Sequence, residues 1–146
     1  MKEFKSLVLF VIGGLVYITI EIVWRKLMGS HPTHWTMFVL GGLSFVVVGG
    51  INEFFPWEMP FWLQTAIGTV CVLILEFTFG CLINIQAGLN VWDYSHLPLN
   101  ILGQVCLPFA FAWAALVAFA IVLDDYLRYW LFGEEKPRYT WRLKKQ

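Results

Sequence analysis

The chain has 146 residues, of which 59% are hydrophobic and 14% are charged, and its mean hydropathy is +0.68. Soluble domains carry about 25% charged residues, so this composition indicates a membrane protein. The formal net charge of zero excludes the overall positive field of a nucleic-acid-binding protein, and we expect no nucleic-acid partner.

Four apolar runs are each long enough to cross a membrane as a helix, which takes about 20 residues. They cover residues 6–24, 35–55, 61–86 and 97–129, and a tail over 130–146 follows them. Tryptophans lie near the ends of these runs, where indole rings settle at the membrane–water interface. The sequence therefore predicts an all-α integral membrane protein. It is expected to be a single bundle of four transmembrane helices, with a structured polar loop between helices 3 and 4.

Lysine and arginine gather on one side of this arrangement. Eight basic residues lie beside the termini, namely Lys2, Lys5, Arg128, Lys136, Arg138, Arg142, Lys144 and Lys145. Only Arg25 and Lys26 lie on the opposite side. Basic residues favour the cytoplasmic side, so we expect both termini in the cytoplasm and the protein in the cell membrane. The first run has no small-residue cleavage site, so we expect no cleaved signal peptide.

With this orientation, many polar residues fall in the outer half of the bundle. Glu21 and Arg25 share one face of the first helix, and Glu76 and Asn84 share one face of the third. The candidate binding residues are Glu21, Arg25, His34, Glu76, Asn84, Trp92, Asp93, Tyr94, Ser95 and Asn100. Asn52 and Glu53, at the inner boundary, form a second candidate site.

Glu76 is the most informative single residue. It stands 15 positions after Phe61, about 22 Å along a helix that rises about 1.5 Å per residue. An acid at that depth costs about 2.5–3.5 kcal/mol on insertion scales, so its side chain should face the interior of the bundle. Two roles stay open: a buried salt bridge or hydrogen bond, for instance to Arg25, that only fixes packing, or the handling of an ion or ligand. Glycines at 41, 42, 49 and 50 predict close contacts between helices.

The loop between the last two runs reads NVWDYSHLPLN, residues 90–100. We expect the fourth helix to begin at or just after Pro98, with Asp93 or Ser95 as its cap. Trp92 and Tyr94 suit an interfacial anchor or a lid over the outer mouth of the bundle. Cys71, Cys81 and Cys106 stand in apolar runs without a metal-binding spacing, so we expect free thiols, no metal and no cofactor.

Four segments carry a resemblance to a known family: GLVYITIEIVWR, HWTMFVLGGLSFVVVGGINE, LEFTFGCLIN and VWDYSHLPLNILGQ. Together they resemble the Trp-Asp-Tyr-Ser (WDYS) family of CmpB-like, ABC-transporter type IV permeases, which includes animal transmembrane proteins. The resemblance covers residues 13–115 and implies a permease. The positions that it marks are Glu21, His34, Asn52, Glu53, Glu76, Gly80, Asn84, Trp92, Asp93, Tyr94, Ser95, Asn100 and Gly103.

The sequence favours a transporter or channel component over two alternatives. Buried acids suit a proton, a cation or a small cationic solute, whereas Arg25 and His34 could receive a carboxylate or phosphate. The chain has no G-x-x-x-x-G-K-[ST] motif, so an ABC role requires a separate ATPase. Four helices make a thin pathway, and we therefore expect a homo-oligomer or a partner subunit. The other expected partners are the lipid bilayer and a small solute, ion or lipid ligand.

One alternative is a membrane-embedded enzyme acting on a lipid or lipid-linked substrate. Asp93, His34, His96 and Glu76 could supply acid–base chemistry for it. Ser95 and His96 are adjacent, however, which is a poor geometry for a nucleophile and its base, so we assign no catalytic residue. The other alternative is an accessory subunit in which the polar residues only lock the helices together.

Overall fold

The computed structural model describes residues 1–143, and these fold into a helical bundle. The elements are α1 (Lys2–Met28), α2 (Thr36–Gly49), α3 (Ile51–Phe54), α4 (Phe61–Gly80), the π-helix η1 (Cys81–Gln86) and α5 (Leu107–Phe132). Because α3 continues α2 and η1 continues α4, the described chain has four helices long and apolar enough to cross a membrane. The predicted all-α fold with four membrane-spanning helices is confirmed.

Glycine and proline set several helix ends. Both α1 and α5 stop at a glycine in the left-handed conformation, Gly29 with φ 64° and Gly133 with φ 66°. This conformation is the common end of a helix because glycine has no Cβ to clash. Pro60 directly precedes α4, and Pro108 lies in the first turn of α5, where its missing N–H leaves no hydrogen bond unmade.

The predicted start of the fourth helix near Pro98 is wrong, because α5 begins only at Leu107. Leu99 and Leu102 have positive φ values of 51° and 52°, and an antiparallel bridge pairs Ile101 with Val105. The chain therefore makes a compact loop over residues 87–106. The proline that opens the helix is Pro108, and neither Asp93 nor Ser95 caps it, since the N-cap is Cys106 without a side-chain hydrogen bond.

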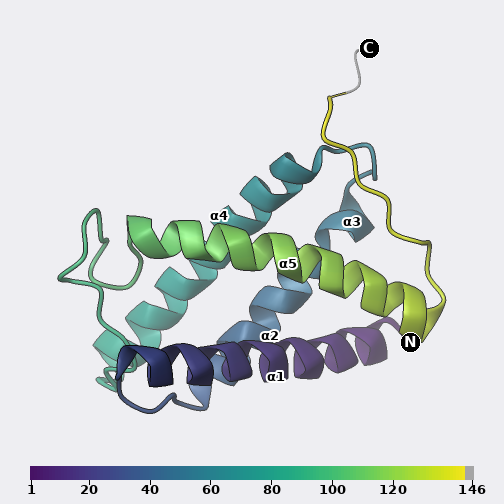
Figure 1. The fold of residues 1–146 in the computed structure, drawn as a ribbon. Coiled ribbons are helices and arrows are strands. Elements are labelled where there is room, and N and C mark those ends of the chain that lie inside the picture. The colour runs from purple at the N-terminus through teal and green to yellow at the C-terminus, as the bar shows by residue number, and fades with distance from the viewer. Residues whose placement is uncertain (144–146) are drawn as a thin grey trace.

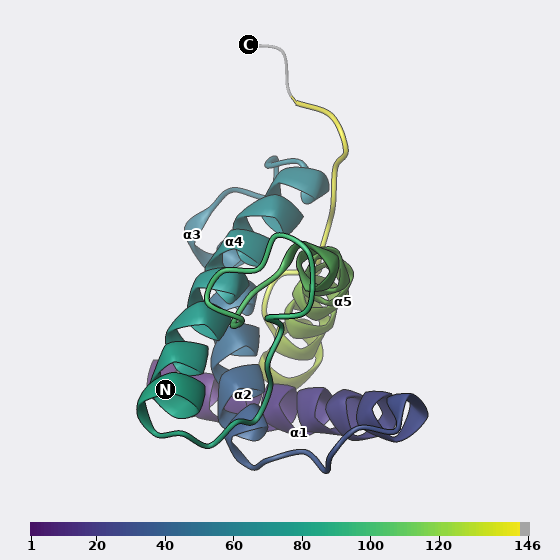
Figure 2. The same ribbon diagram turned by 90° about the vertical axis from the view of Figure 1, so that its left-hand side faces the viewer.

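Helix α2 lies at the centre of the bundle (Figures 1 and 2) and packs against α1, α4 and α5. Helix α1 packs chiefly on α2, and it meets α5 through aromatic side chains such as Tyr17 on Trp113. Figure 1 shows the N-terminus, the end of α5 and the α3–α4 turn towards one end of the bundle, which we call the terminal end. The opposite end, the loop end, carries residues 29–35 and the loop 87–106, which faces the viewer in Figure 2.

Paired glycines let α1 and α2 approach closely, as their spacing predicts. Gly13 and Gly14 of α1 face Phe45 and Phe38 of α2, and Gly41 and Gly42 of α2 face Tyr17 and Phe10 of α1. A Cβ added at Gly42 would lie 2.7 Å from the backbone oxygen of Phe10, which no side-chain rotation can relieve. Small residues at the crossing therefore bring the two backbones together.

Gly42→Ala should therefore lower the free energy of unfolding by about 1–3 kcal/mol, the usual cost of overpacking. Gly50→Ala is the matched control, because its added Cβ would find its nearest neighbour at 3.4 Å and Gly50 has a helical φ of −68°. The control should be neutral or slightly stabilising. Thermal unfolding of both variants in detergent measures the difference, and equal melting temperatures would contradict the close crossing.

Candidate functional site

Glu76 lies on the buried edge of α4. The residues that α4 and η1 bury recur every four positions, from Gln64 through Gly68, Val72, Glu76 and Gly80 to Asn84. Such a row is inclined to the helix axis, as is usual where helices pack across one another. Glu76 is only 2% exposed, so its carboxylate faces the interior of the bundle and not the surrounding lipid.

Aromatic side chains from three segments surround this carboxylate. The Tyr94 hydroxyl, from the loop, donates a hydrogen bond to Glu76 Oε1 at 3.2 Å, and the Tyr94 ring stacks on Phe109. The Trp113 indole lies near the carboxylate, and Glu76 Oε2 is buried without a hydrogen-bond partner. Tyr17 stacks on Trp113 with ring centroids 5.4 Å apart. Burial and the Glu76 charge raise the pKa of the Tyr94 phenol, which keeps Tyr94 a hydrogen-bond donor.

Arg25 does not pair with Glu76, the salt bridge that the sequence left open. Its Nε donates to Glu21 Oε1 at 2.6 Å, one turn earlier on α1. Its other nitrogens donate to the backbone oxygens of His31, Pro32 and Val91. Arg25 therefore ties the two loops of the loop end to α1. Within the described chain, no basic side chain forms an ion pair with Glu76.

A buried network holds the loop on the end of α4. Asn84 Nδ2 donates to Gln104 Oε1 at 2.9 Å, and Asn84 Oδ1 accepts from the backbone N–H of Val91 at 2.7 Å. Trp92 Nε1 donates to the backbone oxygen of Gln104 at 3.0 Å. These side chains are buried and bonded to one another, so Asn84, Gln104 and Trp92 position the loop that carries Tyr94.

The remaining candidates of the loop shape its outer turn. Asp93 Oδ1 accepts from the backbone N–H of Ser95 at 2.9 Å, and this bond holds the pKa of the exposed Asp93 below its usual value. Asn100 bonds to the backbone of Ser95, Leu97 and Gly103. His34 bonds to Thr36 at the start of α2. The structure thus brings Glu21, Arg25, Glu76, Asn84, Trp92 and Tyr94 together, whereas Asp93, Ser95 and Asn100 lie outside this group.

A second polar cluster lies at the terminal end, around the second candidate site. Asn52 Nδ2 donates to Asp125 Oδ2 at 2.7 Å, and Tyr139 donates to the same oxygen at 2.8 Å. Arg128 lies 2.6 Å from Asp124 and 3.6 Å from Glu53. These groups border a hollow of about 190 Å³ whose lining holds four acids and a single arginine. Its lining residues are Asn52, Glu53, Trp57, Asp125, Arg128, Glu134 and Glu135.

Sequence reasoning missed several members of both clusters. Asp124 and Asp125 are acids inside an apolar run, and the i,i+4 spacing of Asp124 and Arg128 was the signal that could have identified them. Trp113 had no signal, because an aromatic residue inside a span is ordinary. Among residues 1–143, no three histidine, cysteine or acidic side chains come together as ligands for a metal ion.

The family model that matches this chain is described as "Putative ABC-transporter type IV" (ABC_trans_CmpB) and covers residues 8–138. The chain belongs to this family. It is an integral, multi-pass membrane protein. The match extends beyond residues 13–115, so the family region includes Asp124, Asp125 and Arg128 of the terminal end. No solved structure matches this chain.

Proposed function

We propose that this chain is the membrane-spanning component of a transporter and that Glu76 binds the transported cation, the proton included. The bias of lysine and arginine supports cytoplasmic termini in the cell membrane, with the loop end outside. Loop 87–106 would then be an outer lid, because Tyr94 reaches from it to the buried carboxylate.

The observation that carries this proposal is the isolation of the Glu76 carboxylate. It is buried, it has no basic partner in the described chain, and Oε2 has no hydrogen-bond donor. A buried carboxylate that only fixed packing would be expected to have its lone pairs satisfied, because unpaired buried polar atoms are costly. Ionisable groups that handle ions in membrane spans face the interior of the bundle or a water-filled cavity.

The two polar clusters have the placement expected of the two ends of a pathway. Apolar side chains of α2, α4 and α5, including Val48, Val72, Val117 and Ile121, form a core cluster between them. Trp113 beside Glu76 and Asp124 of the terminal end are 11 residues apart on α5, about 16 Å at about 1.5 Å per residue. We propose that the pathway opens to one cluster at a time, with the hollow at Asp125 as its inner mouth.

An ABC-type role also requires partners. The chain lacks the P-loop motif, so ATP hydrolysis would come from a separate ATPase that meets the terminal end. Four helices form an incomplete wall around a pathway, and a second copy of the chain or another membrane subunit would complete it.

Purified protein in liposomes tests the role of Glu76. One set of liposomes contains a pH-sensitive dye and the other contains radioactive sodium, and a potassium gradient with valinomycin sets the membrane potential. We expect the wild type to carry protons or sodium faster than protein-free liposomes do. Glu76→Gln, which keeps the shape and removes the ionisable group, should return the rate to that of protein-free liposomes.

Thr78→Val is the matched control, since Thr78 lies two residues away on the exposed side of α4. It should transport at the wild-type rate. A Glu76→Gln variant that carries the ions at the wild-type rate would reject the proposal. A wild type that carries neither ion, combined with a lower melting temperature for Glu76→Gln, would favour an accessory subunit.

A further inference from the structure

The part of the loop that leads into α5 shows the reverse of the polarity expected beside water. Leu99, Ile101 and Leu102 are 75%, 59% and 67% exposed. The amides of the same part are turned inward: Gln104 is buried, and both Gln104 and Asn100 bond to the backbone of the loop. A loop in water exposes its polar side chains and covers its apolar ones as far as it can. This outward face is therefore suited to a hydrocarbon surrounding.

Two of these leucines also have a backbone conformation that leucine disfavours. The φ values of Leu99 and Leu102 are 51° and 52°, in the left-handed region where asparagine and aspartate are the usual non-glycine residues. The loop follows that preference at its start, where the position with φ 49° is the exposed Asn90. Leucine in water would thus be unfavourable through its backbone and through its exposed side chain. Strain of this kind persists where the residue has a further role, which here is a contact made by the leucine side chains.

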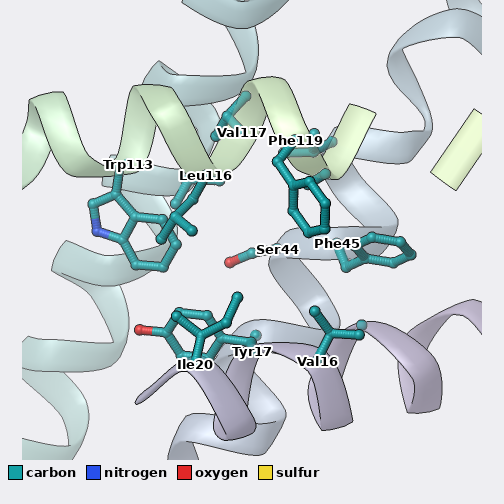
Figure 3. A pocket seen from close by; sticks show the side chains of 14 residues that line it. Val16, Tyr17, Ile20, Ser44, Phe45, Trp113, Leu116, Val117 and Phe119 are labelled. Carbon is teal, nitrogen blue, oxygen red and sulfur yellow. The ribbon is translucent and has the colours of Figure 1, made fainter. Parts of the chain in front are cut away.

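The lipid-facing surface of the spans provides the comparison for this part of the loop. Between α1 and α5 an apolar hollow of about 50 Å³ is lined mostly by hydrocarbon and aromatic side chains, and the exposed Ile20 and Phe119 lie at its edge (Figure 3). Phe111 of α5 is 69% exposed. Because α5 is one of the membrane-spanning helices, the side chains exposed on it face acyl chains. The exposed leucines and isoleucine of the loop match this surface in chemistry and in exposure.

The apolar surface of α5 continues into the loop without a charge. Leu107, the first residue of α5, and Phe111 are exposed and lie one turn apart on the same face. Leu102 stands five residues before Leu107, and no residue from 97 to 123 carries a charged side chain. A chain that leaves the bilayer for water usually places charged residues beside the span, as residues 134–136 do after α5. The loop therefore stays close to the hydrocarbon beyond the first turn of the helix.

The side chains involved favour lipid over a protein partner. Hot spots of protein interfaces are enriched in tryptophan, tyrosine and arginine, and leucine is under-represented among them. Leucine and isoleucine are instead among the side chains whose transfer into a bilayer is favourable. Residues 87–106 contain no lysine or arginine, so the loop has no basic side chain for anionic headgroups. The expected contact is therefore with acyl chains, and zwitterionic lipid suffices for it.

We propose that residues 99–102, which we call the loop tip, insert into the bilayer at the boundary of headgroups and acyl chains. The three apolar side chains of the tip contact acyl chains, while the exposed polar residues Asp93 and Ser95 of the same loop stay in water. Because the loop also carries Tyr94, the membrane holds the segment that reaches Glu76. Insertion of the tip is independent of the proposed function and occurs whether or not Glu76 carries ions.

Photo-crosslinking of the full-length protein in phosphatidylcholine liposomes tests the contact. Leu102→benzoylphenylalanine places the crosslinker on the tip, and Phe111→benzoylphenylalanine places it on the lipid-facing side of α5. His96→benzoylphenylalanine is the matched control, because His96 is exposed on the polar part of the same loop. We expect mass spectrometry to find lipid adducts at Leu102 in a yield similar to that at Phe111, and a loss of lipid adducts at His96.

Three results would overturn the proposal. Crosslinks from Leu102 to a second copy of the chain, or a lack of lipid adducts there while Phe111 forms them, would show that the tip meets protein or water. Lipid adducts at His96 in the same yield as at Leu102 would show that lipid contact does not distinguish the tip from the rest of the loop.

Leu102→Asn tests the same contact through the sign of its effect. Asparagine suits a φ of 52°, so in water the substitution would relieve the backbone and slow hydrogen exchange of the loop. In nanodiscs we expect exchange over residues 97–105 to become about three- to tenfold faster, because an apolar side chain is lost from hydrocarbon. Leu102→Met keeps the apolar side chain and is the matched control, which should leave the exchange unchanged. Slower exchange in Leu102→Asn would contradict insertion of the tip.

Discussion

Replacing Arg128 with methionine should lower the free energy of unfolding by about 3–5 kcal/mol, the cost of leaving a buried charge without its partner. Asp124 is fully buried, and among residues 1–143 the one side chain that donates a hydrogen bond to it is Arg128, at 2.6 Å. Its carboxylate also covers Gly49 of α2, where no side chain fits beneath it. Without the guanidinium, this acid would have to take up a proton or draw water into the end of the bundle.

Arg138→Met is the matched control. Arg138 pairs with Glu135 at 3.2 Å, but both side chains are more than half exposed, and such a pair contributes about 0–1 kcal/mol. Unfolding of each variant by denaturant in detergent gives the two free energies. If Arg128→Met is no less stable than Arg138→Met, the network at the terminal end does not hold the helices together.

The ion pairs around Arg128 explain why Arg128→Met should destabilise more than one helix. Arg128 Nη1 also lies near Glu53 of α3 and near Glu134, which follows α5 and accepts from Lys5 of α1 at 2.6 Å. Arg128 and Glu134 together therefore link three spans through ion pairs. The hollow that we propose as the inner mouth lies against the same group, so its shape depends on these ion pairs.

Much of the fold and part of the site could be predicted from the sequence. Apolar runs of about 20 residues fix the number of spans, because a membrane leaves the backbone few structures besides a helix. The depth and spacing of Glu76 and Asn84 placed both on the buried edge of the third span, formed by α4 and η1, since an acid facing lipid would be too costly.

The loop and the terminal end could not be predicted in the same way. The loop has five backbone positions with positive φ, and leucine occupies two of them, Leu99 and Leu102, where the sequence therefore carries no turn signal. Pro98 resembled a helix start as well as Pro108 does. The sequence placed Asp124 and Asp125 inside an apolar run without further role. Their burial depends on Gly49 of α2, Asn52 of α3 and Tyr139 of the tail, which are distant in sequence from Asp125 or Asp124.

Asn84→Leu should release the loop that carries Tyr94. The substitution leaves the Val91 N–H and Gln104 Oε1 buried without partners, at about 1–3 kcal/mol each. Hydrogen exchange across residues 91–105 of the protein in nanodiscs should therefore become faster, while α2 keeps its protection. Gln86→Leu, an exposed position two residues away, should leave the exchange unchanged.

A second substitution separates the network from simple loss of packing. Gln104→Leu alone should also speed exchange, because it leaves Asn84 Nδ2 without its acceptor. The double variant Asn84→Leu/Gln104→Leu removes both partners of that bond. The free energy by which it destabilises the loop, measured from exchange, should be smaller than the sum for the two single variants, as expected for residues in contact. If the two single destabilisations simply add in the double variant, the amides contribute independently and the loop is held by its apolar contacts, such as Tyr94 on Phe109.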